Sequence, residues 1–273
     1  MKLLLVSDLH YALKQFDWTA RVAEHFDLVV FAGDHLDISG HVDGRAQIVV
    51  VLKYFERLKA KVRLIASSGN HDLDARNPAG EKFARWMSRV RDIGVPTDGE
   101  SLLLDDTLFT ICPWWDGPNA RDAVGQLLAL DAAKQKKRWI WIYHAPPDGS
   151  PTSWSGEKHF GDVELLHWIG EFAPDYVFSG HIHQSPFVRG GSWVDRIGST
   201  WVFNAGRQIG PVPTHIVVDT ERRVALWFSL AGAEIVPLDQ PLQRPVRELD
   251  AIPDWLQTLG SSYLSDPGTN ASS

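Results

Sequence analysis

The strongest constraint on the fold is a set of short apolar runs, each followed at once by polar residues. Strands that are covered on both faces have this continuously apolar texture, and runs this short favour strands over helices. Stretches with helical spacing separate the runs, which indicates the alternation of strands and helices typical of an α/β protein. The runs span residues 2–6, 28–31, 62–65, 139–143 and 176–178.

The remaining segments predict helices and further strands. Helical spacing with charged outer faces predicts helices over residues 42–58, 80–93, 119–136 and 162–172. After residue 180 the texture changes to strand-like segments split by Gly and Pro, which predict a second sheet. These segments are residues 192–196, 200–204, 214–219 and 224–230.

The last part of the chain differs in composition from the rest. From residue 237 onward prolines recur, and residues 260–273 are small and polar with little to bury. We therefore expect one domain over residues 1–236 and an irregular C-terminal arm over residues 237–273 with a disordered end. Trp255 and Leu256 predict one docking contact of this arm.

Charge and cysteine content narrow the class of protein. A net charge of −7 argues against long nucleic acid as a partner, because phosphate-backbone binding needs clustered Lys and Arg. The single cysteine, Cys112, allows no intrachain disulfide and no thiolate zinc cluster, which suits a reducing compartment. The apolar start stops at Ser7, too early for a signal peptide, and no stretch is long enough to cross a bilayer. We expect a soluble, cytoplasmic protein with no membrane partner.

Each of the five apolar runs ends in carboxylate, amide or imidazole side chains. In open α/β sheets, ligands bind beyond the carboxyl ends of the strands, so residues far apart in sequence converge there. Asp8 and His10 stand two residues apart and can share one ion, and His181 and His183 repeat this spacing. Nitrogen and carboxylate donors without sulfur suit Mn, Fe or Zn. The run ends read Ser7-Asp8-Leu9-His10, Gly33-Asp34-His35-Leu36-Asp37, Gly69-Asn70-His71-Asp72, Tyr143-His144-Ala145-Pro146 and Gly180-His181-Ile182-His183.

This ordered set resembles the motif of the calcineurin-like metallophosphoesterase superfamily, which reads Asp-x-His, Gly-Asp, Gly-Asn-His-Asp/Glu, His and Gly-His-x-His. The match runs from Asp8 to His183. The resemblance implies a four-layer αββα sandwich, in which two packed mixed β-sheets are flanked by helices and the metal site lies at the C-terminal ends of the strands. It also implies a hydrolase that uses two divalent metal ions and a metal-bridging hydroxide as the nucleophile.

The resemblance implies a role for each motif residue. One metal would bind Asp8, His10 and His183, the other would bind Asn70, His144 and His181, and Asp34 would bridge the two. His71 would act as the general acid that protonates the leaving oxygen. Asp37 would orient His71 and favour its protonated form. Asn70 would also contact the substrate.

Other residues bear on the substrate. Protein phosphatases of this superfamily carry Asp-Arg-Gly where this chain has Asp37-Ile38-Ser39, and the missing arginine favours small phosphate esters over phosphoproteins. Arg207 is either a replacement that grips the substrate phosphate or an exposed structural arginine. Trp115 follows another apolar run and is either a platform for a nucleobase or aryl group or a packing residue.

Together these features predict a dinuclear metal-dependent hydrolase of small phosphate esters. Manganese is the favoured metal, and phosphodiesters are favoured slightly over phosphomonoesters. A nuclease that uses the same metals stays open, and so does a metal-binding interaction scaffold, because a fold alone does not settle function. The natural substrate and the oligomeric state do not follow from the sequence.

Overall fold

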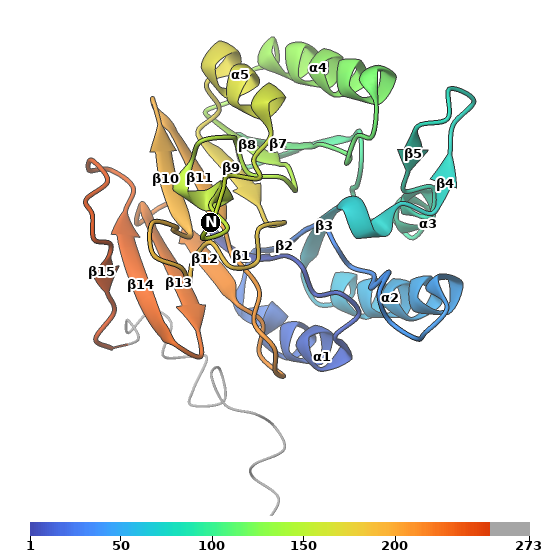
Figure 1. The fold of residues 1–273 in the computed structure, drawn as a ribbon, viewed down its shortest axis with the longest axis horizontal. Helices are drawn as coiled ribbons and strands as arrows, with labels where there is room; N and C mark the ends of the chain where they lie inside the picture. Colours follow the sequence, from blue (N-terminus) through green and yellow to red (C-terminus); the bar gives the residue numbers. More distant parts are fainter. Residues whose placement is uncertain (252–273) are drawn as a thin grey trace, which may run out of the picture.

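Two mixed β-sheets packed face to face form the centre of the protein, which the computed structural model describes over residues 1–251 (Figure 1). The seven-stranded sheet has the order β15-β14-β13-β12-β1-β2-β3, and the six-stranded sheet has the order β10-β11-β9-β8-β7-β6. The strands of the first sheet are β1 (Lys2–Val6), β2 (Leu28–Ala32), β3 (Arg63–Ser67), β12 (His215–Asp219), β13 (Val224–Ser229), β14 (Gly232–Pro237) and β15 (Arg247–Glu248). Those of the second are β6 (Ser101–Leu104), β7 (Thr107–Ile111), β8 (Arg138–Ile142), β9 (Tyr176–Ser179), β10 (Val194–Ile197) and β11 (Thr200–Asn204).

Helices cover the outer face of each sheet. The helices are α1 (Leu13–Val22), α2 (Gly44–Lys59), α3 (Met87–Asp92), α4 (Pro118–Ala132) and α5 (Val163–Phe172). The first three pack against the seven-stranded sheet, where Phe16 and Phe55 lie fully buried. The other two cover the six-stranded sheet, where Leu128 and Leu165 are buried against Trp141. In Figure 1, α1 and α2 lie on the opposite side of the sheets from α4 and α5, so the predicted αββα layering is confirmed.

A third apolar core lies between the two sheets. Leu5 and Val30 project into it from the first sheet, and Phe109, Ile140 and Phe178 project into it from the second, all fully buried. The runs predicted as doubly covered strands are all strands, because each has one face in this core and the other under helices. The short helices η1 (Ala23–His25), η2 (Asn70–Asp72) and η3 (Pro151–Ser153) lie in the connections.

The late strands do not form a sheet of their own, so that prediction was wrong. β11 pairs with β9 in parallel and carries β10 with it into the six-stranded sheet. β12 pairs with β1 in antiparallel orientation and carries β13 and β14 into the seven-stranded sheet. The chain therefore completes both sheets after residue 190.

The predicted helix over residues 80–93 is also largely wrong. Only α3 is helical, whereas β5 (Lys82–Phe83) pairs with β4 (Ala75–Arg76) as a short hairpin. The turn of this hairpin is closed by Asn77, whose Oδ1 accepts from the Glu81 amide and whose backbone amide donates to the Glu81 carbonyl. The Glu81 carboxylate in turn accepts hydrogen bonds from the Asn119 and Ala120 amides at the start of α4, which ties the hairpin to that helix.

The described part of the predicted C-terminal arm packs against the sheets. β15 pairs with β14 and forms one edge of the seven-stranded sheet, and Leu242 and Val246 contact the core between the sheets. The predicted disordered end and the docking of Trp255 and Leu256 lie outside the described residues. Within residues 1–251, no helix has the length and apolarity that a membrane span requires.

Candidate metal centre

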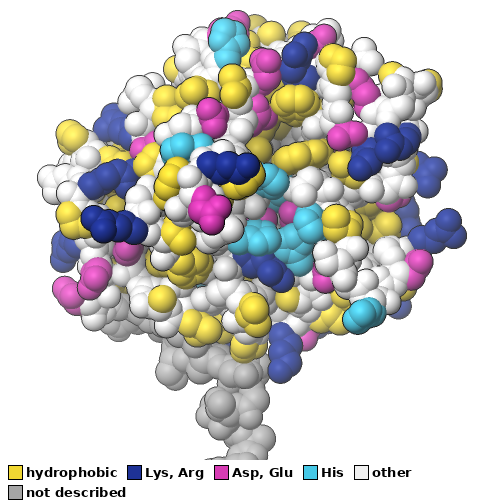
Figure 2. Space-filling view, viewed as in Figure 1, with side chains coloured by type: hydrophobic (Ala, Val, Ile, Leu, Met, Phe, Trp, Pro, Cys, Tyr) yellow, Lys and Arg dark blue, Asp and Glu magenta, His cyan; other side chains and the backbone are white. Residues whose placement is uncertain are grey.

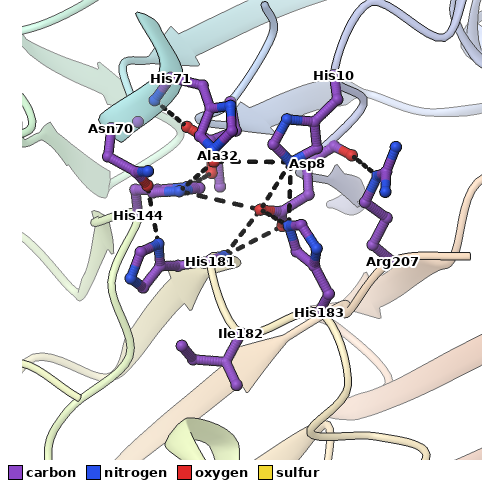
Figure 3. Close-up of polar contacts among 12 residues, drawn as sticks. Asp8, His10, Ala32, Asn70, His71, His144, His181, Ile182, His183 and Arg207 are labelled. Carbon is purple, nitrogen blue, oxygen red and sulfur yellow. Dashed lines mark hydrogen bonds and ion pairs between the residues drawn. The ribbon is translucent and has the colours of Figure 1, made fainter. Parts of the chain in front are cut away.

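The predicted metal ligands lie on loops that leave both sheets at one common edge (Figure 3). They are Asp8 and His10 after β1, Asp34 after β2, Asn70 after β3, His144 after β8, and His181 and His183 after β9. Figure 2 shows histidine side chains gathered around a hollow near the middle of this face. The structure thus brings together residues that are up to 175 positions apart in the chain (183 − 8).

One cluster of possible metal ligands comprises Asp8, His10, Asp34 and His183. The Nε2 atoms of His10 and His183 lie 3.0 Å apart. His183 Nε2 lies 3.3 Å from Asp8 Oδ1, and His10 Nε2 lies 3.7 Å from Asp34 Oδ2. These are the side chains predicted for the first metal, together with the bridging carboxylate.

A second cluster shares Asp34 with the first and adds His144 and His181. His144 Nε2 lies 3.2 Å from Asp34 Oδ2. Asn70 joins this cluster, because its Oδ1 lies 2.8 Å from His181 Nδ1. The carboxylate of Asp34 therefore lies between two groups of donors, in the position that a bridging ligand requires.

The donor atoms fit divalent cations. His144 Nδ1 donates to the Ala32 carbonyl at 2.6 Å, so the neutral ring would carry its lone pair on Nε2. That Nε2 atom is buried and has no hydrogen-bond partner among the described residues. A histidine whose second nitrogen is fixed by a backbone carbonyl is the usual arrangement of a metal ligand. A cation between the facing nitrogens of His10 and His183 would also satisfy both lone pairs.

The protonation states of the site residues also favour the binding of a cation. Burial lowers the pKa of His10 and of His181 to about 4, so both rings are neutral and can bind a cation. Burial alone would raise the pKa of Asp34, but the neighbouring His144 outweighs it and lowers the pKa to about 2. Burial likewise opposes protonation of His144, yet Asp34 and Asp8 raise its pKa to about 9. An incoming cation must therefore displace a proton from His144 at neutral pH.

Several of these residues have a left-handed backbone. The φ angles are 56° for Asp8, 42° for His10, 56° for Asp34 and 68° for His181. For residues other than glycine this conformation costs roughly 1–2 kcal/mol each, and such strain is concentrated at functional sites. The surrounding structure must hold these loops in place.

Asp72 fixes the loops after β2 and β3, a role that the sequence did not reveal. Its fully buried carboxylate accepts hydrogen bonds from the backbone amides of Asp34, His35, Leu36 and Gly69 at 2.8–3.1 Å. It also contacts His35 Nδ1 at 2.9 Å. The available signal was the last position of Gly-Asn-His-Asp, where the motif contains one more carboxylate than its metal ligands require.

The predicted partnership of His71 and Asp37 is not formed in this structure. Asp37 Oδ1 accepts a hydrogen bond from the Ser39 amide at 2.9 Å, whereas His71 Nδ1 is buried without a hydrogen-bond partner among residues 1–251. The His71 ring lies 4.4 Å from the ring of His10, and its backbone amide donates to Asp34 Oδ1. His71 is thus beside the metal ligands, and the role of Asp37 stays a prediction.

The two candidates for substrate contact lie at different distances from the metal ligands. Arg207 Nε donates to the Asp8 carbonyl at 3.1 Å, which places its guanidinium beside the first cluster (Figure 3). Trp115 Nε1 donates to the hydroxyl of Tyr143 at 2.5 Å. Its neighbour Trp114 is closer to the site, with its ring 5.2 Å from that of His181.

Two recesses adjoin the clusters. The first, which we call the aromatic recess, has a volume of about 560 Å³ and contains His144 and His181 in its wall. Its other main lining residues are Trp114, Trp115, Asp116, Tyr143, Phe160, Asp162 and Glu164. The second, the His71 recess, has a volume of about 470 Å³ and is lined by His71, Asp37, Arg45, Gln47 and Arg85, among others. Two of the metal ligands, His144 and His181, line the aromatic recess, and His71, whose ring lies 4.4 Å from that of His10, lines the other.

Replacing Gly69 by Ala is expected to abolish metal binding. The added Cβ would collide with Asp34 Oδ1 and stand 2.6 Å from the Asp34 amide nitrogen and 2.8 Å from His144 Cδ2. Overpacking of this kind costs about 1–3 kcal/mol and would displace the shared carboxylate. Metal content after dialysis checks this. Gly44→Ala is the control, because a Cβ there meets nothing within 4 Å; equal metal content in both variants would contradict the prediction.

Asp72→Asn should weaken metal binding by about 10- to 100-fold while the protein still folds. Whichever way the amide is turned, its NH₂ group faces backbone donors that the carboxylate now satisfies. Calorimetric titration with Mn²⁺ measures the loss, and Asp92→Asn, at an exposed carboxylate, serves as the control. Unchanged affinity would show that the loops hold their shape without Asp72.

Comparison with known proteins identifies the fold and the family. The structure is similar to that of TT1561 from Thermus thermophilus, with a TM-score of 0.55, 13% identity, and coverage of 87% of this chain and 98% of that chain. It is also similar to the purple acid phosphatase PPD1 from yellow lupin (Lupinus luteus) seeds, with a TM-score of 0.54, 12% identity, and coverage of 91% and 53%.

No curated protein matches the sequence. The model of one family, the calcineurin-like phosphoesterases, matches residues 1–185, a span that contains every predicted metal ligand. The chain belongs to the calcineurin-like phosphoesterase family.

Proposed function

We propose that this protein is a manganese-dependent phosphodiesterase that hydrolyses small phosphodiesters. The observation that carries the proposal is that the two clusters, which share Asp34, adjoin two recesses: His144 and His181 line one, and His71, beside His10, lines the other. A phosphodiester has an organic group on each side of its phosphorus, and each recess can hold one. A phosphomonoester would leave one recess unused.

The side chains divide the chemistry among them. Two divalent cations held by the clusters would activate a water molecule at neutral pH and withdraw charge from the phosphate. Asn70 and Arg207, at opposite ends of the clusters in Figure 3, would position the phosphoryl oxygens. As the water oxygen bonds to phosphorus and the P–O bond to the leaving group breaks, His71 would give its proton to the leaving oxygen. The products are an alcohol and a phosphomonoester.

The choice of manganese and of compartment follows from the donor set and the cysteine content. Carboxylate and amide oxygens together with imidazole nitrogens, and no sulfur, suit Mn²⁺, with Fe or Zn as alternatives. We place the protein in the cytoplasm, because its single cysteine, Cys112, is buried and free, as suits a reducing compartment.

Metal-stripped enzyme reloaded with Mn²⁺ should hydrolyse bis-p-nitrophenyl phosphate faster than p-nitrophenyl phosphate. Asp34→Asn should reduce this turnover at least about 100-fold, because both clusters lose their shared anion. Initial rates with metal content measured in parallel check both expectations. Faster hydrolysis of the monoester would instead indicate a phosphatase, and full metal content without turnover of either ester would indicate an interaction scaffold.

His71→Ala should slow esters with poor leaving groups by about 10²- to 10⁴-fold and esters of p-nitrophenol much less. A proton donor matters most when the leaving oxygen is strongly basic. The measurement is kcat for a series of diesters with leaving alcohols of increasing pKa, at equal metal content. If kcat depends on the pKa of the leaving alcohol equally steeply in the wild-type enzyme and in the variant, His71 is not the proton donor. A smaller effect of the same kind in Asp37→Asn would support the predicted pairing of Asp37 with His71.

A further inference from the structure

The aromatic recess has two kinds of wall. Three aromatic residues, Trp114, Trp115 and Phe160, line it together with three acidic residues, Asp116, Asp162 and Glu164. The volume of about 560 Å³ lies within the range of roughly 300–1,000 Å³ usual for small-ligand pockets. His144 and His181 also line the recess, so a group bound there would lie beside the metal ligands, within reach of a phosphate held at the clusters.

The charge of the recess is negative. No Lys or Arg is among its lining residues, all of which belong to the described part of the chain, whereas Arg45 and Arg85 line the His71 recess. Glu164 is partly compensated by Arg121 at 3.5 Å, and Asp162 caps α5 through the Glu164 and Leu165 amides. Asp116 is exposed and accepts a backbone hydrogen bond from Lys82. The carboxylates outweigh the single neighbouring guanidinium.

One of the aromatic rings that line the recess already contacts a cation. Lys158 Nζ lies 4.4 Å from the centre of the Phe160 ring, and the Phe160 side chain is 47% exposed. A cation within about 6 Å of an aromatic face is attracted by the negative charge of that face. The same rings and carboxylates would attract an ammonium group of a substrate.

We propose that the aromatic recess binds an ammonium group, so that the substrates are phosphodiesters of an amino alcohol or a quaternary ammonium alcohol. This proposal rests on the phosphodiesterase function. The ammonium-bearing substituent lies against Trp114 beside His144 and His181, and the other substituent lies on the side of His71 and leaves. A neutral nucleobase would gain contact with the rings but nothing from the carboxylates, and a second phosphate would be repelled by them.

The test compares three diesters that share p-nitrophenol as the leaving group: the choline, ethyl and thymidine 5′ esters of p-nitrophenyl phosphate. The choline ester should have a kcat/KM about tenfold above that of the ethyl ester. Asp116→Asn and Glu164→Gln should each lower this choline-to-ethyl ratio at least about threefold. Lys158→Met should raise the ratio, because it removes a competing cation from the Phe160 ring.

Control variants distinguish the effect of a lost carboxylate in the recess from an effect on folding. Glu171→Gln on the same helix as Glu164 removes an exposed carboxylate outside the recess and should leave the ratio unchanged. Variants of Trp114 are less suitable, because its ring lies 5.6 Å from that of the metal ligand His144. The opposite signs expected for Glu164→Gln and Lys158→Met cannot both arise from a loss of folding.

Three results would overturn the proposal. A preference for the thymidine ester that the carboxylate variants do not change would assign the recess to a nucleobase. Equal kcat/KM for all three esters would show that the recess does not contact the substrate. If no diester is hydrolysed, the phosphodiesterase function fails. The ammonium site is then tested separately by calorimetry, which compares the binding of choline with that of its neutral isostere 3,3-dimethylbutanol. Equal binding of the two compounds, or no binding of either, rejects the ammonium site.

Discussion

The packing of the two sheets on each other is the constraint on which the site depends. Leu5, Val30 and Phe178 are fully buried in the core between them. This close packing fixes where the strand ends of one sheet lie relative to the strand ends of the other. Each cluster takes residues from both sheets, as Asp8 follows β1 whereas His183 follows β9. A substitution in this core, far from the hollow, would therefore alter the distance between donors that it does not touch.

Much of the fold and of the site could be predicted from local patterns. Strands buried on both faces have continuously apolar runs, so β1, β2, β3, β8 and β9 stand out in the sequence. The chemically active side chains follow these runs directly. Because the strands end at one edge of the sheets, these side chains lie close together, and no knowledge of other contacts is needed to predict this. This is why the residues predicted as ligands, from Asp8 to His183, are found together.

What could not be predicted depends on contacts between distant segments. The assignment of β10 to β13 to two different sheets is set by pairing with β9 and β1, which no local pattern encodes. The hairpin that contains Glu81 is held to the distant start of α4 by the Glu81 carboxylate. Asp72 acts through backbone amides, and backbone hydrogen bonds leave no pattern in the sequence of the loops that donate them. The nearness of Trp114 to His181 likewise depends on the path of the connection between β7 and α4.

The left-handed backbone at several of the predicted ligands restricts their identity in a second way. Coordination chemistry alone would accept Glu or Cys beside Asp and His. Among residues other than glycine, however, Asp, Asn and His adopt a φ near +56°, as at Asp8 and Asp34, far more readily than most. At these positions the residue must therefore meet two requirements: its side chain must bind a cation, and its backbone must adopt the left-handed conformation. A glutamate could reach the same ion only if the loop that carries it adopted a different backbone conformation.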